Sequence, residues 1–552
     1  MNNVLIFLLI LLMPLLSSCD GPSQEAANVT AQSTVPAETQ TAAKPVASPV
    51  DTAELEIGRA LYQDGLRANG EPLTAIVTGD VEILGTQFSC DGCHGISGMG
   101  SKEATIIVPI IAGPILFAPA VQPERVAYDL ASLATVLRDG VTPSGRQIGH
   151  LMPRFRLTDK ELASLAAYLG SLSTGPSPGV DDSTIRFATV VTDNSSEQER
   201  NAVLAVLNRF AEEKSRQTRL ESKRWDRGTT PESRLHTVHR DWILDVWELS
   251  GQESGWGEQL RAYYERNPVF AIIGGLLPES PGPLARFCEQ NAIPCVLPST
   301  RNPESGDGDL YSLYYSRGLG LEADLIATDL KELQFDVLLQ VYCEASAARA
   351  ADRLETDLTG RTIDTRRLAF DCDEETPIDQ LQGLLEEPRG SVIVYWLDKG
   401  HLSNVAVPSG ARVYFSSTLI GDEIEPLHES VSDSAYLVHP YRLPGTLDPA
   451  FRRMDAWTRT RNIEIRYPRL QGEAFFAAML MSEIVKHLDK FYIREYVLDL
   501  LGHAQGMVLY LPYYSRPTFG PGQIYVSKGG YILPVVNGKL DTGSSDWTIP
   551  AY

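Results

Sequence analysis

Positive charge is scarce in this chain. Its 552 residues carry 48 Lys and Arg against 71 Asp and Glu, which gives a formal net charge of −23. Binding to nucleic acid needs a basic face that neutralises phosphates, so this balance argues against DNA or RNA as a partner. Hydrophobic residues make up 43% of the chain, which is enough for buried cores in more than one domain.

The N-terminal apolar run is too short to span a membrane. It covers residues 4–16, against the roughly 20 residues that a spanning helix needs, and is typical of a signal-peptide core. It ends in "LSSC", Leu16 to Cys19, which resembles the lipobox of bacterial lipoproteins. That resemblance implies lipid attachment to Cys19 and anchoring to a bacterial membrane. An ordinary secretory signal with an unrelated cysteine is the alternative.

Two segments lack any apolar period and divide the rest of the chain. Residues 19–50 are rich in Ala, Ser, Thr and Pro, and a flexible coil of that length spans about 30 Å. A second break, rich in Pro, Gly and Asp, follows residue 173. We therefore predict a signal peptide at 1–18, a tether at 19–50, a domain at 51–175, a linker at 176–183 and a domain at 184–552.

Cysteine is sparse, with seven in the chain, but Cys90 and Cys93 stand three apart with His94 directly after them. A zinc site needs about four ligands, and no second Cys or His pair lies nearby. A thioredoxin-type dithiol would follow a strand in a βαβ unit and does not require the histidine. Cys-Xaa-Xaa-Cys-His in an exported chain instead predicts covalent attachment of haem c. Cysteines at i and i+3 share one side of a helical turn, so both can form thioethers while His94 ligates the iron.

The second axial ligand is expected on a loop across the haem. Met152 is followed by Pro153 and then by a helix that opens with a capping box of Thr158 and Glu161. Met/His ligation is typical of electron-carrying cytochromes c, so we predict His94 and Met152 as the ligands. Ligation by His150, two residues before Met152, is the alternative and would lower the reduction potential.

With these motifs the chain resembles a monohaem class I cytochrome c over about residues 53–173. The resemblance implies an all-α domain whose first and last helices cross near Gly58, Tyr62 and Tyr168. One departure is the long segment 66–87 before the haem motif, where a Thr-Gly-Asp between apolar runs predicts a hairpin. The chain has one Cys-Xaa-Xaa-Cys-His motif, which argues against dihaem peroxidases and multihaem chains.

From Thr184 onward, apolar runs such as "VFAIIGG" (269–275) and "SVIVYWL" (391–397) alternate with helical segments. Such runs are typical of buried parallel strands, and their alternation with helices predicts doubly wound, Rossmann-like α/β architecture. The segment is longer than one such sheet normally holds, so we expect two lobes.

Residues 259–300 bring a second resemblance, to type I periplasmic binding proteins of the branched-chain amino-acid and amide class, which extends over about 184–545. It implies a small polar organic ligand between the lobes, at the carboxyl ends of the strands. Ordinary loop chemistry is the alternative for each candidate residue. The candidates are Gly274, Gly275, Ser299, Thr300 and Tyr315.

Four further cysteines are even in number, as expected in an oxidising compartment. Cys343 and Cys372 end consecutive strand candidates, and Cys288 and Cys295 lie at a helix end and on the next strand. We predict the disulfides Cys288–Cys295 and Cys343–Cys372, with buried thiols as the alternative. From Thr184 onward, the sequence has neither the Gly-Xaa-Ser-Xaa-Gly nucleophile motif nor a cluster of metal ligands, so we do not predict an enzyme.

Together these features predict a lipid-anchored periplasmic electron-transfer protein with one haem c, a redox partner in the same compartment, and a module that binds a ligand or docks a partner. A solute receptor for transport or sensing, with an accessory haem, is one alternative. A haem enzyme such as a peroxidase is another, and it requires an open position on the iron.

Overall fold

The protein is described here by a computed structural model. It describes residues 52–550 apart from 104–105, 122–123, 226–239, 280, 305, 307, parts of 373–389 and of 403–409, 422–434, 444–448, 505–510, 537–538 and 544. The predicted signal peptide, Cys19 and the tether lie outside the described residues. Within the described part of the chain, no helix is both long and apolar enough to cross a membrane.

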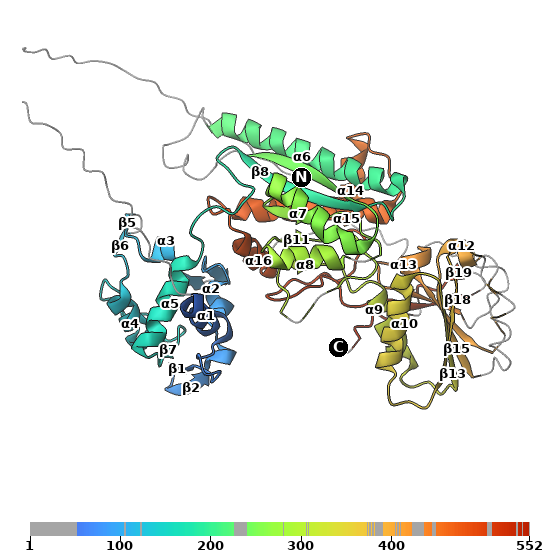
Figure 1. Cartoon of the computed structure of the whole chain (residues 1–552), viewed down its shortest axis with the longest axis horizontal. Helices are drawn as coiled ribbons and strands as arrows, with labels where there is room; N and C mark the ends of the chain where they lie inside the picture. Colours follow the sequence, from blue (N-terminus) through green and yellow to red (C-terminus); the bar gives the residue numbers. More distant parts are fainter. Residues whose placement is uncertain are drawn as a thin grey trace, which may run out of the picture. The chain divides into compact units, whose positions relative to one another are not determined.

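Residues 52–173 form a helical domain around an apolar cluster (Figure 1). Its helices are α1 (Thr52–Arg59), the π-helical turn η1 (Ala60–Asp64), η2 (Gly85–Gln87), α2 (Asp91–His94), α3 (Gly113–Leu116), α4 (Leu130–Asp139) and α5 (Asp159–Ser171). The capping box of Thr158 and Glu161 starts α5 as expected. Helix α1 packs against α5, with the rings of Tyr62 and Tyr168 5.5 Å apart. The crossing therefore lies where the resemblance placed it.

The all-α expectation for this domain is wrong in detail, because the domain also contains short antiparallel strands. These are β1 (Thr74–Val77), β2 (Val81–Leu84), β3 (Ser101–Glu103), β4 (Ile106–Val108), β5 (Ala120–Val121), β6 (Glu124–Arg125) and β7 (Arg154–Phe155). Strands β1 and β2 form the hairpin predicted within 66–87, in the register Thr74↔Leu84 to Val77↔Val81. Strand β7 pairs with β1 and makes the hairpin a small sheet. The inserted segment supplies strands because its apolar runs flank a Gly79–Asp80 turn with positive φ at both residues.

The second domain begins with a parallel sheet, which with its helices we call the first lobe. Its strand order is β12-β11-β10-β8-β9. The strands are β8 (Thr184–Thr192), β9 (Asp241–Leu249), β10 (Ala271–Ile273), β11 (Cys295–Val296) and β12 (Ser312–Leu313). The helices are α6 (Glu197–Trp225), η4 (Glu253–Gly255), α7 (Trp256–Arg266) and α8 (Gly282–Gln290).

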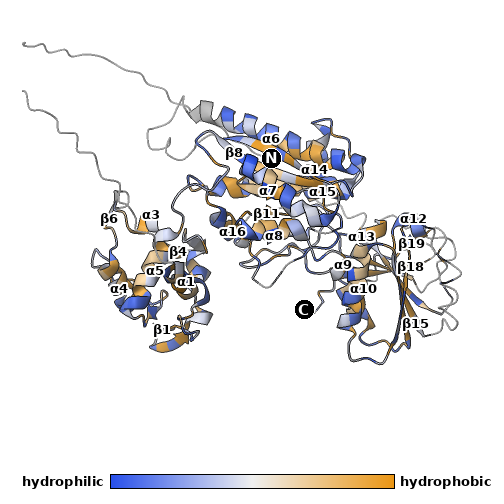
Figure 2. Cartoon of the chain, viewed as in Figure 1, coloured by the Kyte–Doolittle hydropathy of each residue, from blue (hydrophilic) through white to orange (hydrophobic). Residues whose placement is uncertain are grey.

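A second sheet, the centre of the second lobe, has the order β14-β13-β15-β16-β17-β18-β19. The strands are β13 (Val337–Tyr342), β14 (Asp364–Ala369), β15 (Ser391–Trp396), β16 (Arg412–Ser416), β17 (Ala435–His439), β18 (Tyr531–Val536) and β19 (Lys539–Leu540). The helices are α9 (Leu319–Leu330), α10 (Ala345–Asp357), α12 (Lys399–Leu402) and α13 (Ser417–Ile420). Strands β13 to β17 are parallel, and every residue of β15 is buried. Hydrophobic residues are frequent in the strands of this sheet (Figure 2).

The chain returns to the first lobe through α14 (Pro449–Arg459), α15 (Pro468–His487) and α16 (Arg494–Gly502). Side chains of α15 such as Phe476 share a buried cluster with Phe187 of β8. The chain then passes back to β18 of the second lobe. The two-lobed α/β architecture is thus the predicted one.

The structure contains two disulfides, Cys288–Cys295 and Cys343–Cys372. The first joins α8 to β11 in the first lobe, and the second joins the segments that follow β13 and β14 in the second lobe.

Candidate haem site

The two cysteines and the histidine of the haem motif share one helical turn. Cys90 is the N-cap of α2, and its carbonyl accepts hydrogen bonds from the amides of Cys93 (3.3 Å) and His94 (2.9 Å). Cys90 is partly buried and Cys93 is exposed. This geometry presents both sulfur atoms from one side of the turn, as two thioether bonds to a haem require.

His94 is only 7% exposed, and its Nδ1 lies 2.9 Å from the carbonyl oxygen of Pro109. When Nδ1–H donates to that carbonyl, Nε2 is left as the nitrogen available to a metal. Burial lowers the pKa of His94, which favours the neutral imidazole that metals bind. This contact and the burial of His94 suit its imidazole to a role as a metal ligand through Nε2.

The two alternatives for this motif find no support in the structure. Burial raises the pKa of the Cys90 thiol to about 12, with smaller contributions from Asp91 and Cys93, whereas redox-active thiols have lowered pKa values. A zinc site would need several clustered ligands, and the described residues contain no group of three or more His, Cys, Asp or Glu that could hold a metal.

Met152 and His150 differ in burial. Met152 is partly buried and packs against the apolar cluster that contains Tyr62, whereas His150 is exposed. Arg154, only 8% exposed, donates hydrogen bonds to the carbonyls of Met152 (2.5 Å) and Ile148 (2.7 Å). Arg154 therefore holds the Met152 loop from inside the domain, a role that sequence reasoning missed.

The surface of this domain fits a large apolar prosthetic group. Of the twelve exposed large hydrophobic side chains among the described residues, eight lie between residues 81 and 151. Exposed apolar side chains that gather in one domain are typical of a surface that is covered by a ligand or partner. The eight residues are Val81, Leu84, Phe88, Ile106, Ile107, Val126, Leu130 and Leu151. The residues present therefore fit a haem attached at Cys90 and Cys93.

In the second domain, two of the five predicted ligand residues contact one residue, Glu473. Ser299 Oγ donates to Glu473 Oε2 (2.5 Å), and the Tyr315 hydroxyl donates to the backbone carbonyl of Glu473 (2.5 Å). Both side chains are buried, and Thr300 is partly buried with its hydroxyl near the amide of Asn302 (3.3 Å). Sequence reasoning missed Glu473, although a carboxylate inside the apolar stretch of α15 is an unusual signal.

The predicted glycines follow β10 but have packing roles in the structure. Gly275 has φ +109°, and a Cβ atom there would lie 2.4 Å from the carbonyl oxygen of Val190 on β8. Gly274 has φ +57° and faces Ala477 and Leu207 in the core. These positions need glycine for their backbone conformation, and Gly275 needs it also for close packing against β8.

Glu473 is 3% exposed and has further partners. The Tyr514 hydroxyl donates to its Oε1 (2.9 Å), and Arg469 forms an ion pair with the same atom (3.1 Å). The ring of Tyr315 stacks on that of Tyr514 with centroids 5.1 Å apart. A polar ligand can bind such a cluster by replacing one of these internal partners.

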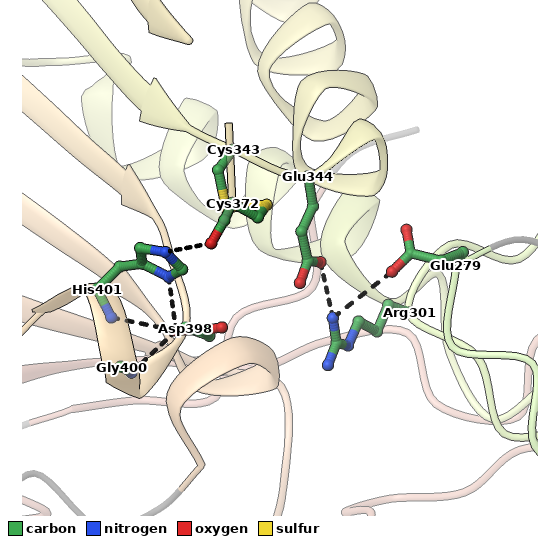
Figure 3. The surroundings of a disulfide bond; sticks show 8 residues. All are labelled: Glu279, Arg301, Cys343, Glu344, Cys372, Asp398, Gly400 and His401. Carbon is green, nitrogen blue, oxygen red and sulfur yellow. Dashed lines mark hydrogen bonds and ion pairs between the residues drawn. A yellow bond between two sulfur atoms is a disulfide. The ribbon is translucent and has the colours of Figure 1, made fainter. Parts of the chain in front are cut away.

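Near this cluster an ion pair joins the two lobes. Arg301, two residues after Ser299, contacts Glu344 at the start of α10 (2.7 Å) and Glu279 (3.9 Å), as Figure 3 shows. Glu344 directly follows Cys343 of the second disulfide. The predicted ligand region therefore lies beside a direct link between the lobes.

Comparison with protein families identifies the first domain. The cytochrome c family model matches residues 84–173, which include the Cys90–His94 motif, Met152 and α5. Residues 84–173 are a cytochrome c domain. A cytochrome c domain implies covalently bound haem c and supports electron transfer. No curated protein matches the chain.

Structural neighbours of the rest of the chain are type I periplasmic binding proteins. A branched-chain amino-acid ABC transporter protein from Thermus thermophilus with bound valine is 10% identical, covers 67% of this chain and 97% of its own, and has a TM-score of 0.49. A leucine-binding protein from Thermotoga maritima is 12% identical, covers 66% and 98%, and has a TM-score of 0.45. A substrate-binding periplasmic protein from Ralstonia solanacearum is 14% identical, covers 66% and 100%, and has a TM-score of 0.46.

Proposed function

We propose that this protein is an extracytoplasmic cytochrome that transfers one electron at a time through a single covalent haem c. Cys90 and Cys93 would hold the haem, and His94 and Met152 would ligate the iron. The observation that carries the proposal is the turn that presents both sulfurs while Pro109 fixes Nδ1 of His94. The bound haem supplies the redox couple, and the chain sets its potential through ligand identity and burial.

With His94 and Met152 both bound to the iron, the haem would have no open position for a substrate. Arg154 supports this ligation, because its hydrogen bonds hold the Met152 loop against the domain core. We therefore propose that the protein is an electron carrier and not a haem enzyme. The electron donor or acceptor would be a protein of the same compartment.

The second domain would bind a small polar organic molecule or dock a partner. The cluster of Ser299, Tyr315 and Glu473 supports ligand binding, because these buried polar groups lie close to the Arg301–Glu344 link between the lobes. A solute receptor with an accessory haem is the second candidate. The observation that favours it is the two-lobed α/β architecture of the second domain.

A lipid on Cys19 would keep the protein at a bacterial membrane, with the 19–50 tether giving the domains reach. This part of the proposal rests on the lipobox resemblance. Mass spectrometry of the protein from its own envelope tests it: the mature chain should begin at Cys19 with a lipid attached, and a chain cleaved elsewhere without lipid would contradict it.

The haem assignment is tested with the purified holoprotein. Denatured protein should retain the mass of one haem, and Cys90→Ser with Cys93→Ser should lose it. The reduced wild-type protein should not bind carbon monoxide, whereas Met152→Ala should bind it through the vacated axial position. His150→Ala is the matched control and should behave as wild type. Carbon monoxide binding by the wild type would refute Met/His ligation and favour an enzyme.

A further inference from the structure

The loop after the haem motif is held by a residue of the second domain. The Asp499 carboxylate accepts hydrogen bonds from the backbone amides of Ile96 (2.8 Å) and Ser97 (3.0 Å) and from Ser97 Oγ (2.5 Å). Asp499 lies on α16, about 400 residues later in the chain. Two carboxylate oxygens that together accept three hydrogen bonds show the pattern of an ionised carboxylate. Burial raises the pKa of Asp499, and the hydrogen bonds from Ser97 and Ile96 oppose that rise.

Gly95 shows how closely the carboxylate approaches the motif. This residue directly follows His94 and has φ +75°, and a Cβ atom there would lie 2.4 Å from Asp499 Oδ2. On its other side, the Tyr62 hydroxyl donates to the Gly95 carbonyl (2.6 Å). Glycine is therefore required, because it leaves room for the carboxylate while the backbone is fixed from two sides.

The helix that carries Asp499 is itself fixed to the first lobe. Arg494 at its N-terminal end is 5% exposed and donates to backbone carbonyls of that lobe, including Phe270 (3.1 Å) and Asn291 (3.0 Å). Ile493, just before the helix, packs into the apolar cluster of the cytochrome domain. Asp499 thus lies on a rigid element that belongs to one domain and contacts the other.

We propose that Asp499 is a positioning residue for the haem, through which the second domain tunes its reduction potential. The carboxylate fixes the backbone that follows the proximal ligand His94, and it adds a negative charge beside the motif. A negative charge near the iron stabilises the ferric state over the ferrous state and lowers the potential. The proposal goes beyond the electron-carrier function and rests on it, because it requires the haem.

The test compares midpoint potentials of full-length holoprotein variants by redox titration. Asp499→Asn removes the charge but keeps the shape, and it should raise the potential. Asp499→Ala also removes the acceptors, and it should raise the potential and weaken the long-wavelength absorption band of Met-ligated ferric haem. Glu483→Gln is the matched control: this carboxylate on α15 pairs with Lys486 at the surface, and its loss should leave the potential unchanged.

Two results would overturn the proposal. One is a potential of Asp499→Asn equal to that of the wild type. The other is a variant that loses thermal stability while its potential and absorption spectrum stay unchanged, which would give Asp499 a purely structural role. Failure of the haem function itself is distinguishable, because the wild-type protein would then lack covalent haem before any variant is made.

Discussion

Replacing Gly58 by alanine should separate the two helices that frame the cytochrome domain. Gly58 lies on α1, where a Cβ atom would be 2.2 Å from the carbonyl oxygen of Ser164 and 2.6 Å from Tyr168 Cβ, both on α5. Neither atom can rotate away, since one is backbone and the other is bonded directly to it. The helices would have to move apart by about 1 Å to restore ordinary contact.

The cost follows from two opposing effects. Overpacking of a well-packed contact costs about 1–3 kcal/mol and occasionally more. Alanine recovers about 1 kcal/mol of helix propensity relative to glycine, although the short contacts at Gly58 place the overpacking cost at the upper end of its range. We expect a net loss of about 2 kcal/mol, which lowers the melting temperature of a domain of this size by roughly 8 °C.

The assay is thermal unfolding of the full-length holoprotein, followed by circular dichroism in the haem absorption band. Gly170→Ala is the matched control, because Gly170 lies on the same helix α5 and the nearest atom to its added Cβ is Phe117 Cε2 at 3.9 Å. That variant should be neutral or more stable by up to about 1 kcal/mol. Equal stability of Gly58→Ala and wild type, or equal destabilisation by both variants, would refute the reasoning.

Three further predictions concern the second domain. Arg494→Met should lower the free energy of unfolding by about 3–5 kcal/mol in chemical denaturation, because four backbone carbonyls lose a buried charged donor. Replacing Cys343 and Cys372 by serine should cost about 3 kcal/mol in thermal unfolding, and no loss would contradict a disulfide between them. Burial lowers the pKa of His401, but its hydrogen bond and charge interaction with Asp398 outweigh burial and leave that pKa raised. The pair should therefore stabilise the protein at pH values below about 6.5 and lose this effect as pH rises through the raised pKa; His401→Gln should flatten that part of the profile of melting temperature against pH.

The haem-attachment motif could be predicted from a local pattern, because its residues are close together in the sequence. Cys90, Cys93 and His94 lie on one turn, so their spacing determines what they can bind together. The capping box at Thr158 also follows from a short-range rule, whereas the crossing at Gly58 came from the family resemblance. The all-α expectation was wrong because it came from the family resemblance, while the hairpin came from the residues of the 66–87 segment itself.

The ligand region of the second domain was predicted less well. Ser299 and Tyr315 do meet, but the residue that joins them, Glu473, lies more than 150 residues later on α15. Gly275 looked like a place where backbone could approach a ligand, whereas the structure uses it to pack β10 against β8. The sequence pattern predicts that a glycine or a hydroxyl has a specific role. It does not predict which residue contacts it in the folded protein.

Asp499 is the clearest case of this limit, and it bears on function. In the sequence it is an ordinary acidic residue on a short helix, with no motif around it. Its importance arises only because Arg494 fixes that helix to the first lobe and thereby directs the carboxylate at the amides of Ile96 and Ser97. The local motif determines which cofactor the chain holds, whereas long-range contacts of this kind determine the charge and the rigidity around it.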